Sequence, residues 1–338
     1  MKAIVLEKPG SFAPGERPDP AKPGKGEALV KIRRVGICGT DYHAFRGKQP
    51  FFLYPRVLGH ELGVEVVEVG AGVKKVKVGD RASVEPYFNC GTCIACRNGK
   101  TNCCANLKVL GVHIDGGMCE HLVIPADKLH TSKKLSLDQL ALVETLGIGA
   151  HAASRANLRK DEFALIIGAG PIGLSVVPFA QATGAKVIVT DINERRLAFC
   201  REQFGVEHTA VAGENLKADL EKISGGDLPT AVFDVTGNPQ SMMRAFDLLA
   251  PGGRLVFVGL FQGDVTFNDP NFHRREMTLL ASRNSTSADF RHIIGLMESG
   301  KLDTTPWITH RAPRDEMPEQ FDSWLKPESN VIKAVVEF

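Results

Sequence analysis

The chain has almost no excess of either charge. Its 338 residues include 41 Lys and Arg against 39 Asp and Glu, a formal net charge of +2. This balance, and the lack of a long basic stretch, argue against a nucleic acid or another polyanion as partner. The densest basic run, Lys74 to Lys77, precedes Val78-Gly79-Asp80-Arg81, so we interpret it as a solvated turn between strands.

Long apolar runs are also missing. No run approaches the ~20 residues that a membrane-spanning helix needs, so we expect no membrane partner. Only four apolar residues, Ala3 to Leu6, precede Glu7, which is too few for a secretory signal. Repeats and low-complexity tracts are absent. We therefore expect a cytoplasmic globular protein, long enough for two domains with sizeable cores.

The chain contains eight cysteines, and their presence in such a protein has to be explained. In a reducing compartment, clustered cysteines bind metal more often than they form disulfides. Four of them have the spacing of a closed tetrahedral Zn²⁺ site, namely Cys90, Cys93, Cys96 and Cys104. Four thiolates leave no open position, so this pattern predicts a structural zinc. Cys103 could replace Cys104 as the fourth ligand, but we favour Cys104.

Further metal ligands are spread along the chain. Cys38 lies in Gly36-Ile37-Cys38-Gly39-Thr40-Asp41-Tyr42-His43, and His60 precedes Glu61 between two glycines. A lone Cys or His is usually a packing residue, but the combination favours a second metal site. Glu144 interrupts the apolar side of a helix predicted over 137–156. A carboxylate there is costly unless it is protonated, paired or bound to a metal.

A glycine turn marks the second half of the chain. The apolar strand predicted over 163–167 runs into Gly168-Ala169-Gly170-Pro171-Ile172-Gly173, and a helical pattern follows. In this context the glycines allow a tight turn, close approach of a pyrophosphate and close packing of helix and strand. The first N–H groups of the helix then point at the phosphates. We predict a dinucleotide site that includes Gly168, Gly170, Pro171, Ile172 and Gly173.

The next predicted strand, 186–190, ends in Asp191, eighteen residues after Gly173. A carboxylate there can accept hydrogen bonds from both ribose hydroxyls and repels a 2′-phosphate, which favours NAD over NADP. Arg195 and Arg196 lie nearby. Arg196 is a candidate cofactor contact, and the pair could instead hold a phosphate.

Strands and helices alternate after residue 163. Strands are predicted over 186–190, 208–211, 231–235, 254–258 and 277–281, with helices near 193–204, 239–249 and 287–299. This rhythm is typical of a doubly wound parallel sheet. Dinucleotides lie at the carboxyl ends of such strands, which makes Thr236, Gly237 and Gly259 candidate cofactor residues. Residues 1–35 have the pattern of short, turned strands of an irregular barrel, and 110–124 that of strands around the turn Asp115-Gly116-Gly117. Residues 330–338 have the pattern of a strand that rejoins the first domain.

These motifs and their order resemble the zinc-dependent medium-chain dehydrogenases over essentially the whole chain. The resemblance rests on GICGTDYH at 36–43, GHE at 59–61, VGDR at 78–81, the cysteines at 90–104 and GAGPIG at 168–173. Within the family, the chain is most similar to the polyol and sugar-acid branch, which includes sorbitol, L-threonine and L-galactonate or L-gulonate 5-dehydrogenases. The family implies a GroES-like catalytic domain, 1–150 with 286–338, and a Rossmann domain, 151–285, that binds NAD.

The resemblance also implies a catalytic zinc bound by Cys38 and His60, with Glu144 as third ligand. In the family, Glu61 either holds the zinc-bound water or is itself a ligand. Relatives of the polyol type often have Pro after the third ligand, whereas here Thr145 follows. Thr40 is the expected proton acceptor, with His43 passing the proton to water. Asp41 is a candidate to orient the imidazole of His60.

The expected activity is hydride transfer between a secondary alcohol of a sugar acid or polyol and NAD. A neutral polyol or an L-threonine-type substrate is the alternative, and a non-enzymatic nucleotide-binding relative is a distant one. A carboxylate substrate needs a cation, for which Arg46, Lys48 and Arg283 are candidates, although Arg283 could instead contact the cofactor. Family members are commonly homodimers or homotetramers, and we expect one of these states.

Overall fold

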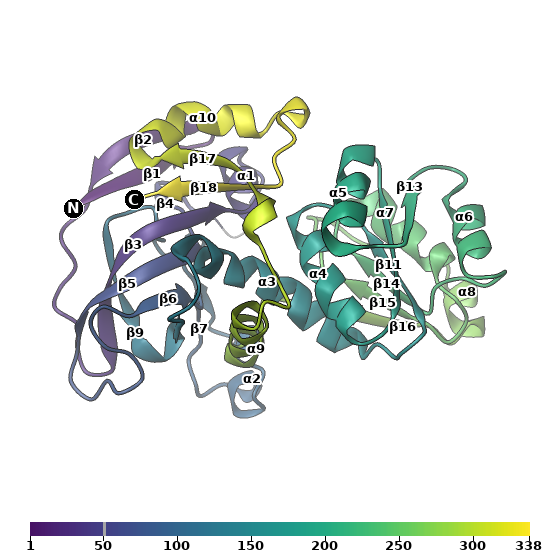
Figure 1. Ribbon diagram of the computed structural model, residues 1–338, viewed down its shortest axis with the longest axis horizontal. Coiled ribbons are helices and arrows are strands. Elements are labelled where there is room, and N and C mark those ends of the chain that lie inside the picture. Colours follow the sequence, from purple (N-terminus) through teal and green to yellow (C-terminus); the bar gives the residue numbers. More distant parts are fainter. Residues whose placement is uncertain (50–51) are drawn as a thin grey trace. The chain divides into compact units, whose positions relative to one another are not determined.

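A computed structural model of the chain describes residues 1–49 and 52–338 (Figure 1). The chain separates into two compact units, Met1–Thr145 with Ser285–Phe338, and Leu146–Asn284. The boundary falls inside helix α3 (Leu137–Ala156), the helix that also contains the predicted boundary between residues 150 and 151. The first unit therefore takes its residues from both ends of the chain.

The first unit is built from short strands, as predicted. Its larger sheet has the order β10-β6-β5-β3-β18-β17, and β9 also pairs with β3. A smaller sheet has the order β2-β1-β4, and β7 pairs with β8. The strands are β1 (Lys2–Lys8), β2 (Ser11–Glu16), β3 (Glu27–Ile37), β4 (Arg56–Val57), β5 (Glu61–Val69), β6 (Arg81–Val84), β7 (Tyr87–Phe88), β8 (Lys108–Val109), β9 (His121–Pro125), β10 (Leu129–Thr131), β17 (Ile308–Pro313) and β18 (Lys333–Glu337).

Alternation along β3 shows why this sequence forms a half-buried strand. Ala28, Val30 and Ile32 point into the apolar core of the unit, while the residues between them are partly exposed. β18 pairs with β3 in antiparallel register, Ala334 opposite Ile37, so the last strand of the chain completes the sheet begun by the third. The helices of this unit are α1 (Gly39–Phe45), α2 (Ile94–Arg97), α9 (Ser287–Glu298) and α10 (Met317–Trp324), together with the start of α3.

The strands predicted over 110–124 were only partly right. β9 begins at His121, whereas residues 110–120 form turns with isolated bridges. Gly116 explains this, because its N–H donates to the carbonyl of Val57 and a Cβ on Gly116 would lie 2.4 Å from the carbonyl oxygen of Gly59. The turn is thus pressed against the segment that carries His60, at a distance that only glycine permits.

The second unit is a six-stranded parallel sheet of order β13-β12-β11-β14-β15-β16, which confirms the predicted doubly wound fold. Helices lie on both faces of it (Figure 1). Its inner strands β11, β12 and β14 are mostly apolar and buried, as strands covered on both faces require, whereas the edge strands β13 and β16 are more exposed. The elements are β11 (Phe163–Ile167), α4 (Pro171–Ala182), β12 (Lys186–Asp191), α5 (Glu194–Phe204), β13 (His208–Val211), α6 (Leu216–Ile223), β14 (Ala231–Asp234), α7 (Pro239–Arg244), β15 (Arg254–Phe257), α8 (Asp269–Arg274) and β16 (Thr278–Ala281).

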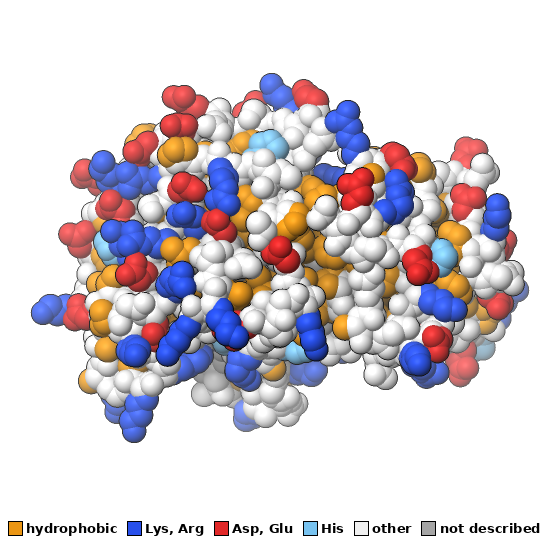
Figure 2. All heavy atoms as spheres, in the orientation of Figure 1, with side chains coloured by type: hydrophobic (Ala, Val, Ile, Leu, Met, Phe, Trp, Pro, Cys, Tyr) orange, Lys and Arg blue, Asp and Glu red, His pale blue; other side chains and the backbone are white. Residues whose placement is uncertain are grey.

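The surface matches the balanced composition. Figure 2 shows Lys and Arg side chains interspersed with Asp and Glu over the visible face. None of the helices in the described part of the chain has the length and apolarity that crossing a bilayer demands.

An aspartate ties the start of α3 to the larger sheet. Asp138 accepts hydrogen bonds from Arg34 Nε of β3 at 2.8 Å and from Arg311 Nη2 of β17 at 2.7 Å. Burial alone would raise the pKa of Asp138, but Arg311 and Arg34 outweigh it and hold the pKa below its ordinary value. A carboxylate with a lowered pKa stabilises the fold above its unfolded pKa of about 4, and this contribution is lost as the pH falls through the folded value.

We expect Asp138→Asn to lower the free energy of unfolding of the first unit by about 1–2 kcal/mol at pH 7, because it weakens the charge-assisted hydrogen bonds to Arg34 and Arg311. The difference from wild type should shrink below about pH 4. Trp307 and Trp324 are the only two tryptophans and both belong to the first unit, so their fluorescence during urea unfolding reports on it.

Asp315→Asn is the matched control. Asp315 also pairs with an arginine, Arg314, but its side chain is 78% exposed against 23% for Asp138. Exposed pairs contribute little, so this variant should unfold like wild type. A pH-independent loss of stability in Asp138→Asn would contradict the assigned role of its charge.

Candidate active site

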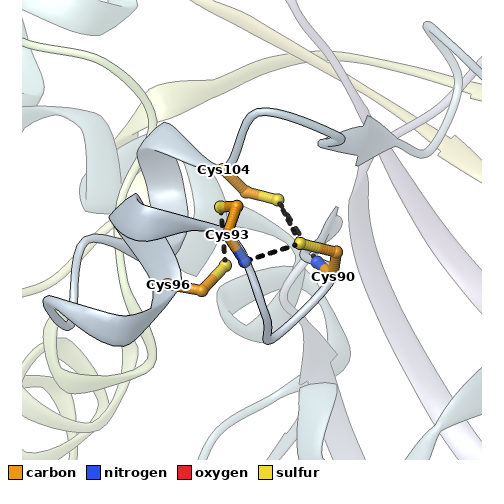
Figure 3. Close-up of side chains that lie close together, drawn as sticks. All are labelled: Cys90, Cys93, Cys96 and Cys104. Carbon is orange, nitrogen blue, oxygen red and sulfur yellow. Dashed lines mark hydrogen bonds between the residues drawn. The ribbon is translucent and has the colours of Figure 1, made fainter.

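Four cysteines converge in one lobe of the first unit, as their spacing predicted. Cys90, Cys93, Cys96 and Cys104 place their sulfur atoms within 4.8 Å of one another (Figure 3). The Cys93–Cys96 and Cys90–Cys104 sulfurs are 3.5 Å apart. Zn–S bonds of about 2.3 Å at tetrahedral angles separate sulfurs by about 3.8 Å, so the cage fits zinc. Cys103 is exposed and lies outside this group.

Hydrogen bonds prepare these sulfurs for metal binding. The N–H of Cys93 donates to Cys90 Sγ at 3.4 Å, and the N–H of Asn106 donates to Cys104 Sγ at 3.3 Å. The hydroxyl of Thr92, followed by backbone N–H groups, lowers the pKa of Cys90 to about 5. Because the thiolate is the form that binds metal, these donors favour the charged state of Cys90. At Cys104, by contrast, the N–H of Cys90 is outweighed by burial and the neighbouring thiols, which raise the pKa to about 11. None of the eight cysteines forms a disulfide.

A second group of candidate ligands lies where β3 ends and β5 begins. Cys38 directly follows β3 and His60 directly precedes β5, and with Glu61 their ligand atoms lie within 4.8 Å of one another. The register of the two strands places Gly36 opposite Glu61, and a Cβ on Gly36 would lie 2.1 Å from Glu61 Oε2. Glycine at position 36 therefore leaves the space that the buried carboxylate of Glu61 occupies.

Asp41 connects the first two of these ligands. Its Oδ2 accepts the N–H of Cys38 at 2.9 Å, and its Oδ1 lies 3.8 Å from His60 Nδ1. Both Asp41 Oδ1 and His60 Nδ1 are buried and lack a hydrogen-bond partner within the described ranges. A thiol, an imidazole and carboxylates gathered around such polar atoms form a donor set that suits Zn²⁺.

Glu144 lies near this group but outside the three residues that are closest together. The carboxylate is only 4% exposed and accepts a hydrogen bond on Oε1 from the hydroxyl of Tyr87. Burial raises the pKa of Glu144, while the charge of His60 opposes the rise. Tyr87 was not anticipated, and no pattern around it could have indicated its partner 57 residues away.

Lys333 is the other residue that sequence reasoning missed. It lies on β18, is 1% exposed, and donates to Glu61 Oε1 at 2.6 Å and to Oε2 at 2.8 Å. Its signal was present, because a lysine inside the apolar stretch from Val331 to Val336 is as costly as a buried glutamate unless it is paired.

The remaining predicted catalytic residues lie on α1. Thr40 is half-buried and His43 is exposed, three residues apart on one face of the helix. Arg46 and Lys48 follow the helix and are exposed.

The glycine turn of the second unit has the geometry that a pyrophosphate cradle requires. Gly168 has a φ of +108°, and a Cβ on Gly173 would lie 1.8 Å from the carbonyl oxygen of Gly168. A Cβ on Gly170 would meet only Arg196 Nη1 among the described residues, at 3.6 Å, which leaves space for a ligand. Pro171 and Ile172 begin α4, whose N–H groups face this turn.

Asp191 ends β12 beside this turn, with Oδ2 accepting the N–H of Ala169 at 2.7 Å and Oδ1 that of Asn193 at 2.8 Å. Thr236 and Gly237 follow β14, and Gly259 follows β15. Gly259 lies so close to Gly237 that a Cβ added to it would be 2.3 Å from the backbone nitrogen of Gly237. Arg283 follows β16. The structure thus brings the predicted cofactor residues to the carboxyl edge of one parallel sheet, where dinucleotides bind.

Comparison with known proteins agrees with this geometry. Residues 24–134 match the family Alcohol dehydrogenase GroES-like domain, and residues 171–299 match the family Zinc-binding dehydrogenase. The chain is 40% identical to L-galactonate-5-dehydrogenase of Escherichia coli strain K12, over 100% of this chain and 99% of that protein. It is 32% identical to L-threonine 3-dehydrogenase of Pyrococcus horikoshii, over 92% of this chain and 91% of that protein.

A solved structure of an alcohol dehydrogenase (rspB) from E. coli CFT073, complexed with NADH, matches with a TM-score of 0.93 and 30% identity. The match covers 100% of this chain and 99% of that one. Fold and sequence lead to the same family, and the chain belongs to the zinc-dependent medium-chain alcohol and polyol dehydrogenases.

Proposed function

We propose that this protein oxidises a secondary alcohol of a sugar acid of the hexonate type, such as L-galactonate or L-gulonate, to a ketone with NAD. The observation that carries the proposal is the gathering of Cys38, His60 and two buried glutamates in one unit of a chain that is 40% identical to an L-galactonate-5-dehydrogenase. Neutral polyols and L-threonine are the alternative substrates.

Each residue has a role in this reaction. Cys38, His60 and Glu144 are the proposed ligands of a catalytic zinc, and three protein ligands leave one coordination position open for substrate. Bound zinc supplies the Lewis acidity that eases loss of the alcohol proton, and NAD supplies the hydride acceptor. Thr40 Oγ1 receives the alcohol proton, and the exposed His43 passes it to water.

The second unit holds the cofactor. Asp191 accepts hydrogen bonds from the adenosine ribose, and the N–H groups at the start of α4 bind the pyrophosphate. Arg46, Lys48 and Arg283 are the proposed candidates for the substrate carboxylate. We also propose that the protein acts as a homodimer or homotetramer.

We expect Cys38→Ser to lower kcat at least ~10³-fold, because the variant loses a thiolate ligand of the catalytic metal. Metal analysis should find about two zinc ions per chain in wild type and about one in the variant. NADH binding, followed by fluorescence, should be unchanged. Cys103→Ser is the control, since Cys103 belongs to neither group, and it should keep full activity. Undiminished turnover in Cys38→Ser would refute the catalytic centre.

Replacing Asp191 tests the cofactor assignment. Asp191→Ser should reduce kcat/KM with NAD at least ~10-fold and narrow the preference for NAD over NADP, because it removes the acceptor for the ribose hydroxyls and the charge that repels a 2′-phosphate. Asp227→Ser, at an exposed position of the same unit, is the control. An unchanged NAD to NADP ratio in Asp191→Ser would argue against this assignment.

A substrate panel tests the proposed activity itself. Formation of NADH should be fastest with L-galactonate or L-gulonate among aldonates, sorbitol-like polyols and L-threonine. Exclusive activity on neutral polyols would remove the sugar-acid proposal while leaving the dehydrogenase class intact.

A further inference from the structure

The ammonium group of Lys333 has four acceptor atoms around it in the interior of the first unit. Beyond the two oxygens of Glu61, at 2.6 and 2.8 Å, it donates to the carbonyl oxygen of Ile37 at 3.2 Å and to Thr145 Oγ1 at 3.1 Å. A lysine has three N–H donors, so these contacts use its full capacity.

Each of these contacts falls on the direct chain neighbour of a proposed zinc ligand. Ile37 precedes Cys38, Glu61 follows His60, and Thr145 follows Glu144. The three segments belong to β3, β5 and α3, and Lys333 reaches all of them from the last strand of the chain. One side chain thus fixes the spacing between the three segments that carry the ligands.

The pairing with Glu61 also bears on which carboxylate binds the metal. Glu61 belongs to the compact group with Cys38 and His60, but both of its oxygens are engaged by Lys333. Glu144, by contrast, accepts a hydrogen bond on Oε1 from a neutral donor, the hydroxyl of Tyr87. Zn²⁺ with one thiolate and one carboxylate is electrically neutral, whereas moving Glu61 to the metal would leave the buried ammonium of Lys333 without its ion-pair partner.

We propose that Lys333 is a positioning residue for the catalytic metal: it joins the three ligand-bearing segments and holds Glu61 as its ion-pair partner, so that Glu144 completes the ligand set. The inference rests on the proposed zinc-dependent function. It assigns a role to a residue that touches neither substrate nor cofactor.

The test uses the full-length protein with Co²⁺ in place of the catalytic zinc, because the visible spectrum of Co²⁺ reports its coordination directly. Lys333→Met should shift the cobalt band, since the unpaired Glu61 then binds the metal. It should also change metal affinity by about 10- to 100-fold in a chelator competition. Adding Glu61→Gln to Lys333→Met should return the band to its wild-type position, and Lys333→Arg should keep it there.

Lys128→Met is the matched control. Lys128 is also buried and pairs with a buried glutamate, Glu85, at 2.6 Å, so its loss should destabilise the protein without moving the cobalt band. A band unmoved by Lys333→Met, or a shift that persists in the double variant, would overturn the inference.

If Lys333→Met does not fold, two single variants still test which glutamate binds the metal. Glu144→Ala should shift the band and Glu61→Gln should not; the opposite result would overturn the inference. The Cys38→Ser variant distinguishes failure of the Lys333 inference from failure of the proposed zinc-dependent function. Loss of the cobalt band in Cys38→Ser upholds the metal centre whatever the Lys333 variants show, and its retention refutes the centre itself.

Discussion

The pairing of two opposite charges, Glu61 and Lys333, is the constraint on which the first unit depends. Both side chains are essentially without solvent contact. Breaking a buried pair from one side costs about 3–5 kcal/mol, because the remaining charge has no partner and no water. The strands that carry the two residues, β5 and β18, must therefore pair with opposite edges of β3 in fixed registers, and the register of β3 with β5 places Cys38 beside His60.

Glycine makes this register possible. Gly36 leaves the space that the Glu61 carboxylate occupies, and Gly116 lets a turn press against Gly59, directly before His60. A methyl group at either position would overlap an oxygen atom. The buried charges and the glycines around them are thus parts of one arrangement, in which backbone segments lie closer together than a side chain at these positions would permit.

Sequence reasoning succeeded where the signal is local. The strand at 163–167, the glycine turn after it and the helix over 137–156 have the predicted bounds, because apolar periodicity and turn chemistry act over a few residues. The cysteine lobe was equally predictable from the sequence, since its four candidate ligands lie within fifteen residues of one another. Lys333 and Tyr87 were missed because their partners, Glu61 and Glu144, are 272 and 57 residues away. The turn at 115–117 was predicted, but the residues on either side of it were taken for strands, because backbone partners such as Leu58, which accepts from Met118, lie in distant parts of the chain.

The position of β18 inside the larger sheet has a consequence for synthesis. This strand lies between β3 and β17, yet it follows every other strand of both units in chain order. Until this strand has been made, the nascent chain exposes the β3 edge that β18 later covers, while all six strands of the second unit have already been made. The second unit can fold during translation, whereas the sheet of the catalytic unit cannot be completed until β18 has been made.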